Sequence, residues 1–166
     1  MSGRLEEQAV SWVSMPKRRA KPKVLISSTQ RAVRVPRKKL SELVAFVARR
    51  EGLRVAEVDL AIVASREMAG LNRRYLARAG ATDVLSFDLS EAPRGGLSAQ
   101  VVVCGDVAAA QAAARGLAVQ RELMLYVVHG LLHLMGYEDA SIRGAAKMHA
   151  REEELLEAFL SRRPNA

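Results

Sequence analysis

Cysteine and aromatic residues are scarce in this chain of 166 residues, and long apolar runs are missing. The single cysteine, Cys104, excludes an internal disulfide, which is typical of proteins from a reducing compartment. Because aromatic residues make up 4% of the chain, we expect a mostly aliphatic core. No stretch approaches the ~20 apolar residues of a membrane span, and residues 1–14 lack the apolar stretch of a signal peptide. These absences favour a cytoplasmic protein without a membrane partner.

Basic residues outnumber acidic ones, 26 to 18, which gives a formal net charge of +8. Such an excess suits a polyanionic partner, either a nucleic acid or a membrane surface, and does not distinguish between them. Residues 1–22 contain the basic cluster Lys17, Arg18 and Arg19 and show no convincing amphipathic pattern. We expect these residues to form a disordered tail, which is either an RNA-binding arm or an inert extension. A single domain is expected over residues 23–166.

Hydrophobic periodicity predicts both strands and helices in this domain. The predicted strands lie at residues 24–26, 58–62, 84–87 and 100–104. The predicted helices lie at about residues 36–52, 65–75, 106–116, 119–135 and 141–160. Their order indicates an α+β fold, in which a small mixed sheet of about four strands packs with about five helices.

Two polar residues, Ser65 and Asp106, precede predicted helices and are candidate N-terminal caps. Helical spacing predicts the buried face of the helix at residues 65–75, namely Met68, Leu71 and Tyr75. In the last helix, the same spacing places one face at Met148, Leu155, Phe159 and Leu160. The charged segment 151–154 of that helix is expected to face water.

The helix predicted at residues 119–135 is apolar nearly all round, yet it carries two of the chain's three histidines. His129 and His133 are four residues apart, so both imidazoles lie on one face and could share one zinc ion. Imidazoles on such an apolar helix need polar partners, which favours a metal; the alternative is that both are core histidines satisfied by hydrogen bonds. Gly130 stands where the H-E-x-x-H motif of zinc proteases has its glutamate base, which disfavours a peptidase. Asp139, beyond the turn expected at Gly136, is a candidate third ligand.

Residues 129–139 resemble the signature H-G-x-L-H-L-x-G-Y-D-H of the YbeY family of bacterial metal-dependent endoribonucleases. The matching residues are His129, Gly130, Leu132, His133, Leu134, Gly136 and Tyr137. A second family signature is L-N-x-x-Y-R followed by T-D-V-L-S-F. Its first part matches Leu71, Asn72 and Tyr75, and its second part matches residues 82–87 completely. The resemblance covers about residues 23–160.

This resemblance implies an α+β domain that binds one zinc ion at the end of a helix and cleaves single-stranded RNA. It also implies rRNA processing (16S rRNA 3′ end maturation), ribosome quality control, and rRNA and the small ribosomal subunit as partners. His129 and His133 are then catalytic residues as well as ligands, because zinc lowers the pKa of a bound water towards about 7. Water and the RNA 2′-OH both stay open as the nucleophile, and the oligomeric state stays open too.

The sequence departs from the family pattern at two functional positions and in the length of one segment. Asp139 replaces the family's third histidine; we expect it to be the third ligand, with His149 as an alternative. Leu76 replaces the family's arginine, and the segment between residues 105 and 121 looks shorter than in typical members. The nearby Arg73, Arg74 and Arg78 either take over RNA binding or form a solvated basic face. The rival functions are a catalytically weakened ribosome- or RNA-binding factor with a structural zinc and a metal hydrolase acting on a small substrate.

Overall fold

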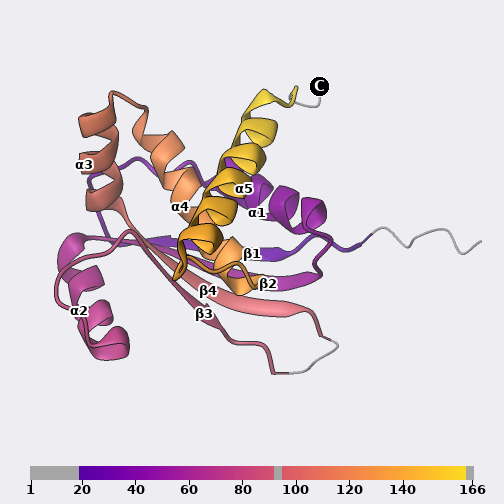
Figure 1. Ribbon diagram of the computed structural model, residues 1–166, viewed down its shortest axis with the longest axis horizontal. Helices are drawn as coiled ribbons and strands as arrows, with labels where there is room; N and C mark the ends of the chain where they lie inside the picture. Colours follow the sequence, from indigo (N-terminus) through magenta and orange to yellow (C-terminus); the bar gives the residue numbers. More distant parts are fainter. Residues whose placement is uncertain (1–18, 92–94, 164–166) are drawn as a thin grey trace, which may run out of the picture.

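A computed structural model describes residues 19–91 and 95–163 and contains the predicted number of strands and helices (Figure 1). The strands are β1 (Lys23–Ser28), β2 (Val55–Val63), β3 (Val84–Asp88) and β4 (Leu97–Cys104). The helices are α1 (Arg37–Arg50), α2 (Ser65–Leu76), α3 (Gly105–Arg115), α4 (Val119–Leu134) and α5 (Ile142–Ser161). The prediction of an α+β fold is therefore confirmed.

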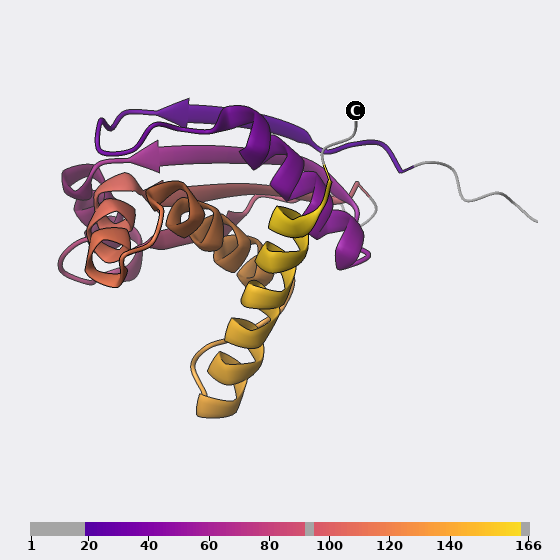
Figure 2. The same cartoon turned by 90° about the horizontal axis from the view of Figure 1, so that it is seen from above.

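The four strands form one mixed sheet in the order β1-β2-β4-β3. Strands β1, β2 and β4 run parallel, whereas β3 pairs antiparallel with β4 and forms an edge of the sheet. Alternate residues of each strand point to opposite faces. Residues such as Leu60 and Val101 join α1, α4 and α5 in the larger core, and residues such as Leu85 and Val102 join Met68 of α2 in a smaller one. Figure 2 shows that the N-terminal end of α5 extends away from the sheet.

Helix α4 is buried on most sides, as its apolar sequence predicts. A Cβ atom at Gly130 would lie 2.8 Å from Val101 Cγ1 and 2.9 Å from Ser86 Oγ, so only glycine lets α4 come this close to β3 and β4. Ser86 Oγ donates a hydrogen bond of 2.9 Å to the carbonyl of Gly130. The C-terminal half of α4 is thereby fixed over the edge strand β3. No helix in the described ranges combines the length and apolar character needed to cross a bilayer.

Both predicted helix caps are wrong. The N-cap of α2 is Ala64 and that of α3 is Cys104, and neither side chain accepts a capping hydrogen bond. Instead, Asp106 Oδ2 accepts a 2.6 Å hydrogen bond from the backbone N–H of Ser65. The two helices follow neighbouring parallel strands, so their N-termini lie side by side and an acid on one helix can serve the other.

Three predictions of burial are also wrong. Tyr75 was predicted to lie on the inner face of α2, but its side chain is 54% exposed, whereas Met68 is buried as expected. Glu152 lies in the segment predicted to face water, but it is only 5% exposed because α5 packs this face against α4. Leu160 is exposed as well, and Leu156 is buried in the core.

Candidate metal centre

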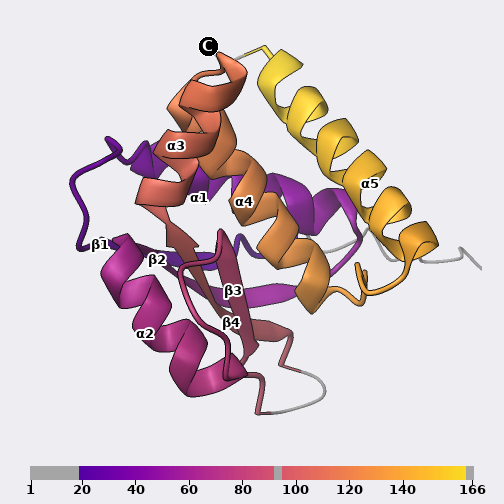
Figure 3. The same cartoon turned by 60° about the vertical axis from the view of Figure 1, so that its left-hand side comes forward.

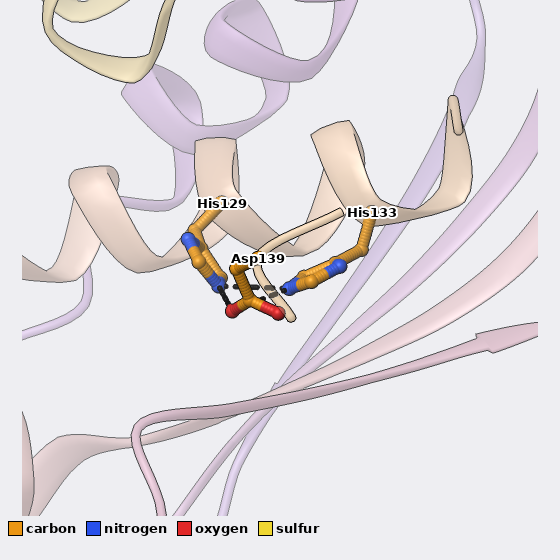
Figure 4. Close-up of side chains that lie close together, drawn as sticks. All are labelled: His129, His133 and Asp139. Carbon is orange, nitrogen blue, oxygen red and sulfur yellow. Dashed lines mark hydrogen bonds and ion pairs between the residues drawn. The ribbon is translucent and has the colours of Figure 1, made fainter. Parts of the chain in front are cut away.

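Three side chains whose donor atoms could bind a metal meet beside the C-terminal half of α4, and we call these atoms the candidate ligand group (Figure 4). The Nε2 atoms of His129 and His133 lie 3.0 Å apart. Asp139 comes from the loop after the helix, and its Oδ2 lies 3.7 Å from His129 Nε2 and 3.4 Å from His133 Nε2. All three donor atoms fall within 4.8 Å of one another, so the group could hold a metal ion.

The dimensions and donor chemistry of this group suit zinc. With bonds of about 2.0–2.1 Å, tetrahedral zinc ligands lie roughly 3.3–3.4 Å apart, and the three observed separations bracket this value. Two imidazoles and one carboxylate form a common zinc donor set. The Asp139 side chain is 51% exposed, so the group is open to solvent. An open set of three donors leaves a coordination position for water or substrate.

The loop that carries Asp139 is held to the end of α1, which is bonded in turn to α5. Gly136 adopts a positive φ of 97°, which favours glycine and turns the chain back after α4. Tyr137 then donates a 3.0 Å hydrogen bond from its hydroxyl to Glu51 Oε2, at the end of α1. Arg151 of α5 donates from Nε to Glu51 Oε1 at 2.6 Å. These contacts fix the loop on which Asp139 depends.

Glu138, the other carboxylate of the loop, is engaged elsewhere. Its oxygens accept hydrogen bonds from the backbone N–H groups of Ala140 and Ser141 and from Ser141 Oγ. The hydrogen bonds from Ser141 and Ala140 lower the pKa of Glu138 below its ordinary value. A side chain at Gly144 would collide with this carboxylate. Glu138 therefore organises the start of α5, and it lies outside the candidate ligand group.

Glu152 is the part of the site that the sequence reasoning missed. This buried carboxylate contacts Nδ1 of His129, while the other ring nitrogen points toward His133 and Asp139 (Figure 4). Such a partner fixes the imidazole tautomer and aims the metal-binding nitrogen. Burial lowers the pKa of His129, but the hydrogen bond and charge of Glu152, together with Asp83 and Asp139, raise it above its ordinary value. One signal in the sequence could have revealed this residue: Glu152 lies four residues after Met148, so it falls on the apolar face of the helix.

His149 lies outside the candidate ligand group. Its side chain is 71% exposed, and its Nδ1 lies 3.7 Å from Oε2 of Glu152. The structure thus places it beside the partner of His129 and not beside Asp139. Of the alternatives for the third donor, only Asp139 joins the two imidazoles within the described residues.

The predicted RNA-binding arginines of α2 are exposed. We call Arg73, Arg74 and the following Arg78 the basic end of α2; within the described ranges, none of them forms an ion pair. Leu76, where the family has arginine, is exposed too. From the tail, Arg19 donates to the carbonyl of Gly52 at 2.8 Å. Lys17 and Arg18 lie outside the described residues.

Comparison with known proteins places the chain in a family. The family model "Endoribonuclease YbeY" matches residues 25–160. This chain belongs to the YbeY family. A YbeY endoribonuclease from Renibacterium salmoninarum is 37% identical over 144 residues, covering 81% of this chain and 92% of that protein. Another, from Mycolicibacterium gilvum, is 32% identical over 150 residues, covering 84% of both chains.

Further relatives agree with this membership. A YbeY endoribonuclease from Anaeromyxobacter sp. is 43% identical over 104 residues, covering 62% of this chain and 54% of its own length. The solution structure of TM1509 from Thermotoga maritima shares the fold, with a TM-score of 0.57 and 24% identity over 82% of this chain and 88% of that one. The resemblance read from the sequence is confirmed. Membership of the YbeY family supports an endoribonuclease role, that is, an RNA-cleaving hydrolase.

Proposed function

We propose that this protein is a zinc-dependent endoribonuclease that cleaves single-stranded RNA. The observation that carries the proposal is the convergence of His129, His133 and Asp139 at an open position, in a chain of an endoribonuclease family. A zinc ion, when bound, lowers the pKa of a water ligand towards about 7 and offsets the charge that develops on a phosphate.

The chain's own residues orient the three ligands and admit the polymer. Glu152 contacts Nδ1 of His129, so that Nε2 of His129 is directed at the site. The hydrogen bond from Tyr137 to Glu51 holds the loop of Asp139. Because Asp139 is half exposed, a long RNA strand can reach the site without a moving lid. Asp139 in place of a neutral histidine lowers the net charge of the site by one and so raises the pKa of bound water.

Phosphate contacts outside the centre come from basic side chains. In this proposal the basic end of α2, with Lys17, Arg18 and Arg19, neutralises phosphates of the bound strand. Residues 1–22 then act as an RNA-binding arm ahead of a catalytic domain at residues 23–166. The cellular role that goes with it is 16S rRNA 3′ end maturation and ribosome quality control in the cytoplasm, with rRNA and the small ribosomal subunit as partners.

One observation favours a second candidate, a catalytically weakened RNA-binding factor with a structural zinc. Leu76 cannot hold a phosphate as the family's arginine could. Against this candidate, structural zinc sites are normally closed by four protein ligands, whereas this group offers three donors and stays open to solvent. The geometry therefore favours the enzyme.

The test is a cleavage assay on end-labelled RNA with protein of known metal content. We expect about one equivalent of zinc per chain and cleavage of single-stranded but not duplex RNA, lost on chelation and restored by added zinc. A 2′,3′-cyclic phosphate product would identify the RNA 2′-OH as nucleophile, and a 5′-phosphate would identify water. Protein that binds zinc and RNA without cutting would establish the second candidate, and protein that takes up no metal would refute the site.

A further inference from the structure

We propose that Tyr75 is a stacking platform for a base of single-stranded RNA, across strand β3 from the metal centre. This inference rests on the proposed function and names a contact for its substrate. Among the phenylalanine and tyrosine side chains that the structure describes, only that of Tyr75 is more than half exposed. The others are buried or half-buried, which is the ordinary fate of aromatic residues in a chain with so few of them.

The ring of Tyr75 is held in place without being covered. It packs edge-to-face on Phe87 of β3, with ring centroids 5.3 Å apart and an interplanar angle of 65°. The guanidinium carbon of Arg74 lies 5.4 Å from the ring centroid. An aromatic face beside an arginine is the usual combination in single-strand binding, because the ring stacks with a base and the cation attracts the backbone.

The position of the ring links it to the metal centre through one strand. Phe87 supports Tyr75 on one face of β3, and the preceding residue, Ser86, hydrogen-bonds Gly130 on the other face. Gly130 stands between the two histidines of α4. Figure 3 shows α2 and α4 on either side of β3. Because β3 is an edge strand, a flexible RNA strand can pass over this edge and contact both sides.

Charge and surface chemistry favour RNA as the occupant. The guanidinium of Arg74 lies beside the ring, and Arg73 and Arg78 are its neighbours in the sequence. Among the described residues, none of the three forms an ion pair with an acid. Leu76 adds exposed apolar surface beside Tyr75 at the position of the family's arginine. Leucine at this position offers no donor to a phosphate but enlarges the apolar surface on which bases can pack. Duplex RNA cannot use such a platform, since its bases are already stacked.

The first experiment separates stacking from charge. Zinc-loaded full-length protein and its Tyr75→Ala and Tyr75→Phe variants are titrated with 2′-O-methyl oligouridine and with inorganic polyphosphate, which carries charge but no bases. We expect Tyr75→Ala to weaken oligouridine binding roughly 5-fold to 150-fold, the range for a stacked base, and to leave polyphosphate binding unchanged. Tyr75→Phe should bind like wild type. Equal loss for both ligands, or no loss for either, would overturn the platform.

A second experiment observes the stacking directly. In a Trp12→Phe background, Tyr75→Trp places the only tryptophan on the platform, and RNA should quench its emission. The matched control is Leu25→Trp in the same background, since Leu25 is also exposed (44%) but lies on β1 at the opposite edge of the sheet. Quenching at both positions, or at neither, would contradict the proposal. RNA cleavage is scored separately, so a quenched but inactive protein would refute the nuclease and keep the platform.

Discussion

The candidate metal centre and the basic end of α2 differ in how firmly the fold holds their side chains. At the candidate metal centre two of the three side chains are supported from outside the group: Glu152 contacts His129, and Glu51 holds the loop of Asp139 through a hydrogen bond with Tyr137. At the basic end of α2 the arginines extend into solvent. Chemistry requires ligands fixed to within fractions of an ångström, whereas attraction of a phosphate backbone requires only charge nearby. Variants at the first region should therefore affect metal and catalysis, and variants at the second should affect affinity.

The largest effect is expected at Asp139. Asp139→Ala removes one of three donors, so zinc affinity should fall by more than the roughly 100-fold that loss of an outer partner can cost, and RNA cleavage should fall with it. Competition with a chromophoric zinc chelator measures the affinity. Asp139→His should retain zinc and shift the onset of cleavage to lower pH, because a neutral ligand leaves more positive charge on the metal.

Glu138→Ala is the matched control for Asp139→Ala, since both carboxylates lie in one loop. Because Glu138 bonds the backbone at the start of α5, its loss should lower the melting temperature and change zinc affinity little. If Glu138→Ala releases zinc while Asp139→Ala keeps it, the assignment of the third ligand is wrong.

The next largest effect is expected at Glu152. Glu152→Gln keeps the shape and a hydrogen-bonding atom but removes the charge that faces His129, so zinc affinity should fall about 10- to 100-fold while the fold persists. The exposed Glu154→Gln, on the same helix, serves as the control and should bind zinc like wild type. Calorimetric titration of both variants against wild type makes the comparison, and equal affinities for all three would deny Glu152 a role in the centre.

The pH dependence of zinc binding gives a second measure of Glu152. Protons should compete with zinc for His129. Burial lowers the pKa of His129 in the metal-free protein, but the hydrogen bond and charge of Glu152, with smaller contributions from Asp83 and Asp139, raise it above its ordinary value. Zinc affinity should therefore fall as pH decreases through this raised pKa. In Glu152→Gln the pH at which protonation begins to weaken zinc binding should be lower than in wild type, although the zinc affinity at high pH is weaker. If this pH is the same in both proteins, Glu152 does not set the protonation of His129.

Linkage predicts the opposite trend for the stability of the metal-free protein. Since folding raises the pKa of His129, the resulting stabilisation is fully present below the unfolded pKa. It is lost as pH rises through the folded pKa. Denaturant titrations of the metal-free protein on either side of neutral pH should show this loss in wild type and a smaller one in Glu152→Gln.

The sequence predicted the fold and the two histidines because both leave local patterns. Period-two and period-3.6 hydrophobicity located the strands and helices, and the spacing of four put His129 and His133 on one face. Asp139 followed from the family signature, and the structure brings it to the same place. Its role as a ligand stays a prediction.

The missed features depend on contacts between distant segments. Glu152 is a charged residue on a helix, and only the packing of α5 against α4 shows that it meets His129. Asp106 caps α2 because β2 and β4 are neighbours, which local sequence does not encode. Tyr75 is exposed because it lies at the end of α2, where the helix extends past the smaller core, whose members include Met68 and Leu85.

The smallest effect is expected at the basic regions and is best seen in salt dependence. Each lost phosphate contact should reduce the slope of log K against log salt by about 0.7 for single-stranded RNA. Neutralising Arg73, Arg74 and Arg78 with glutamine should therefore flatten the slope by roughly 2, with zinc affinity unchanged. Arg66→Gln, exposed at the other end of α2, is the control and should leave the slope intact.

Deleting residues 1–22 extends the same measurement to the tail. Because an RNA-binding arm contributes charge and no ligand, the deletion should weaken RNA binding and flatten the slope while the rate at saturating RNA stays the same. An unchanged slope would identify the tail as an inert extension. A lower rate at saturation would contradict the distinction drawn between the two regions, since charge that only attracts RNA has no effect once the RNA is bound.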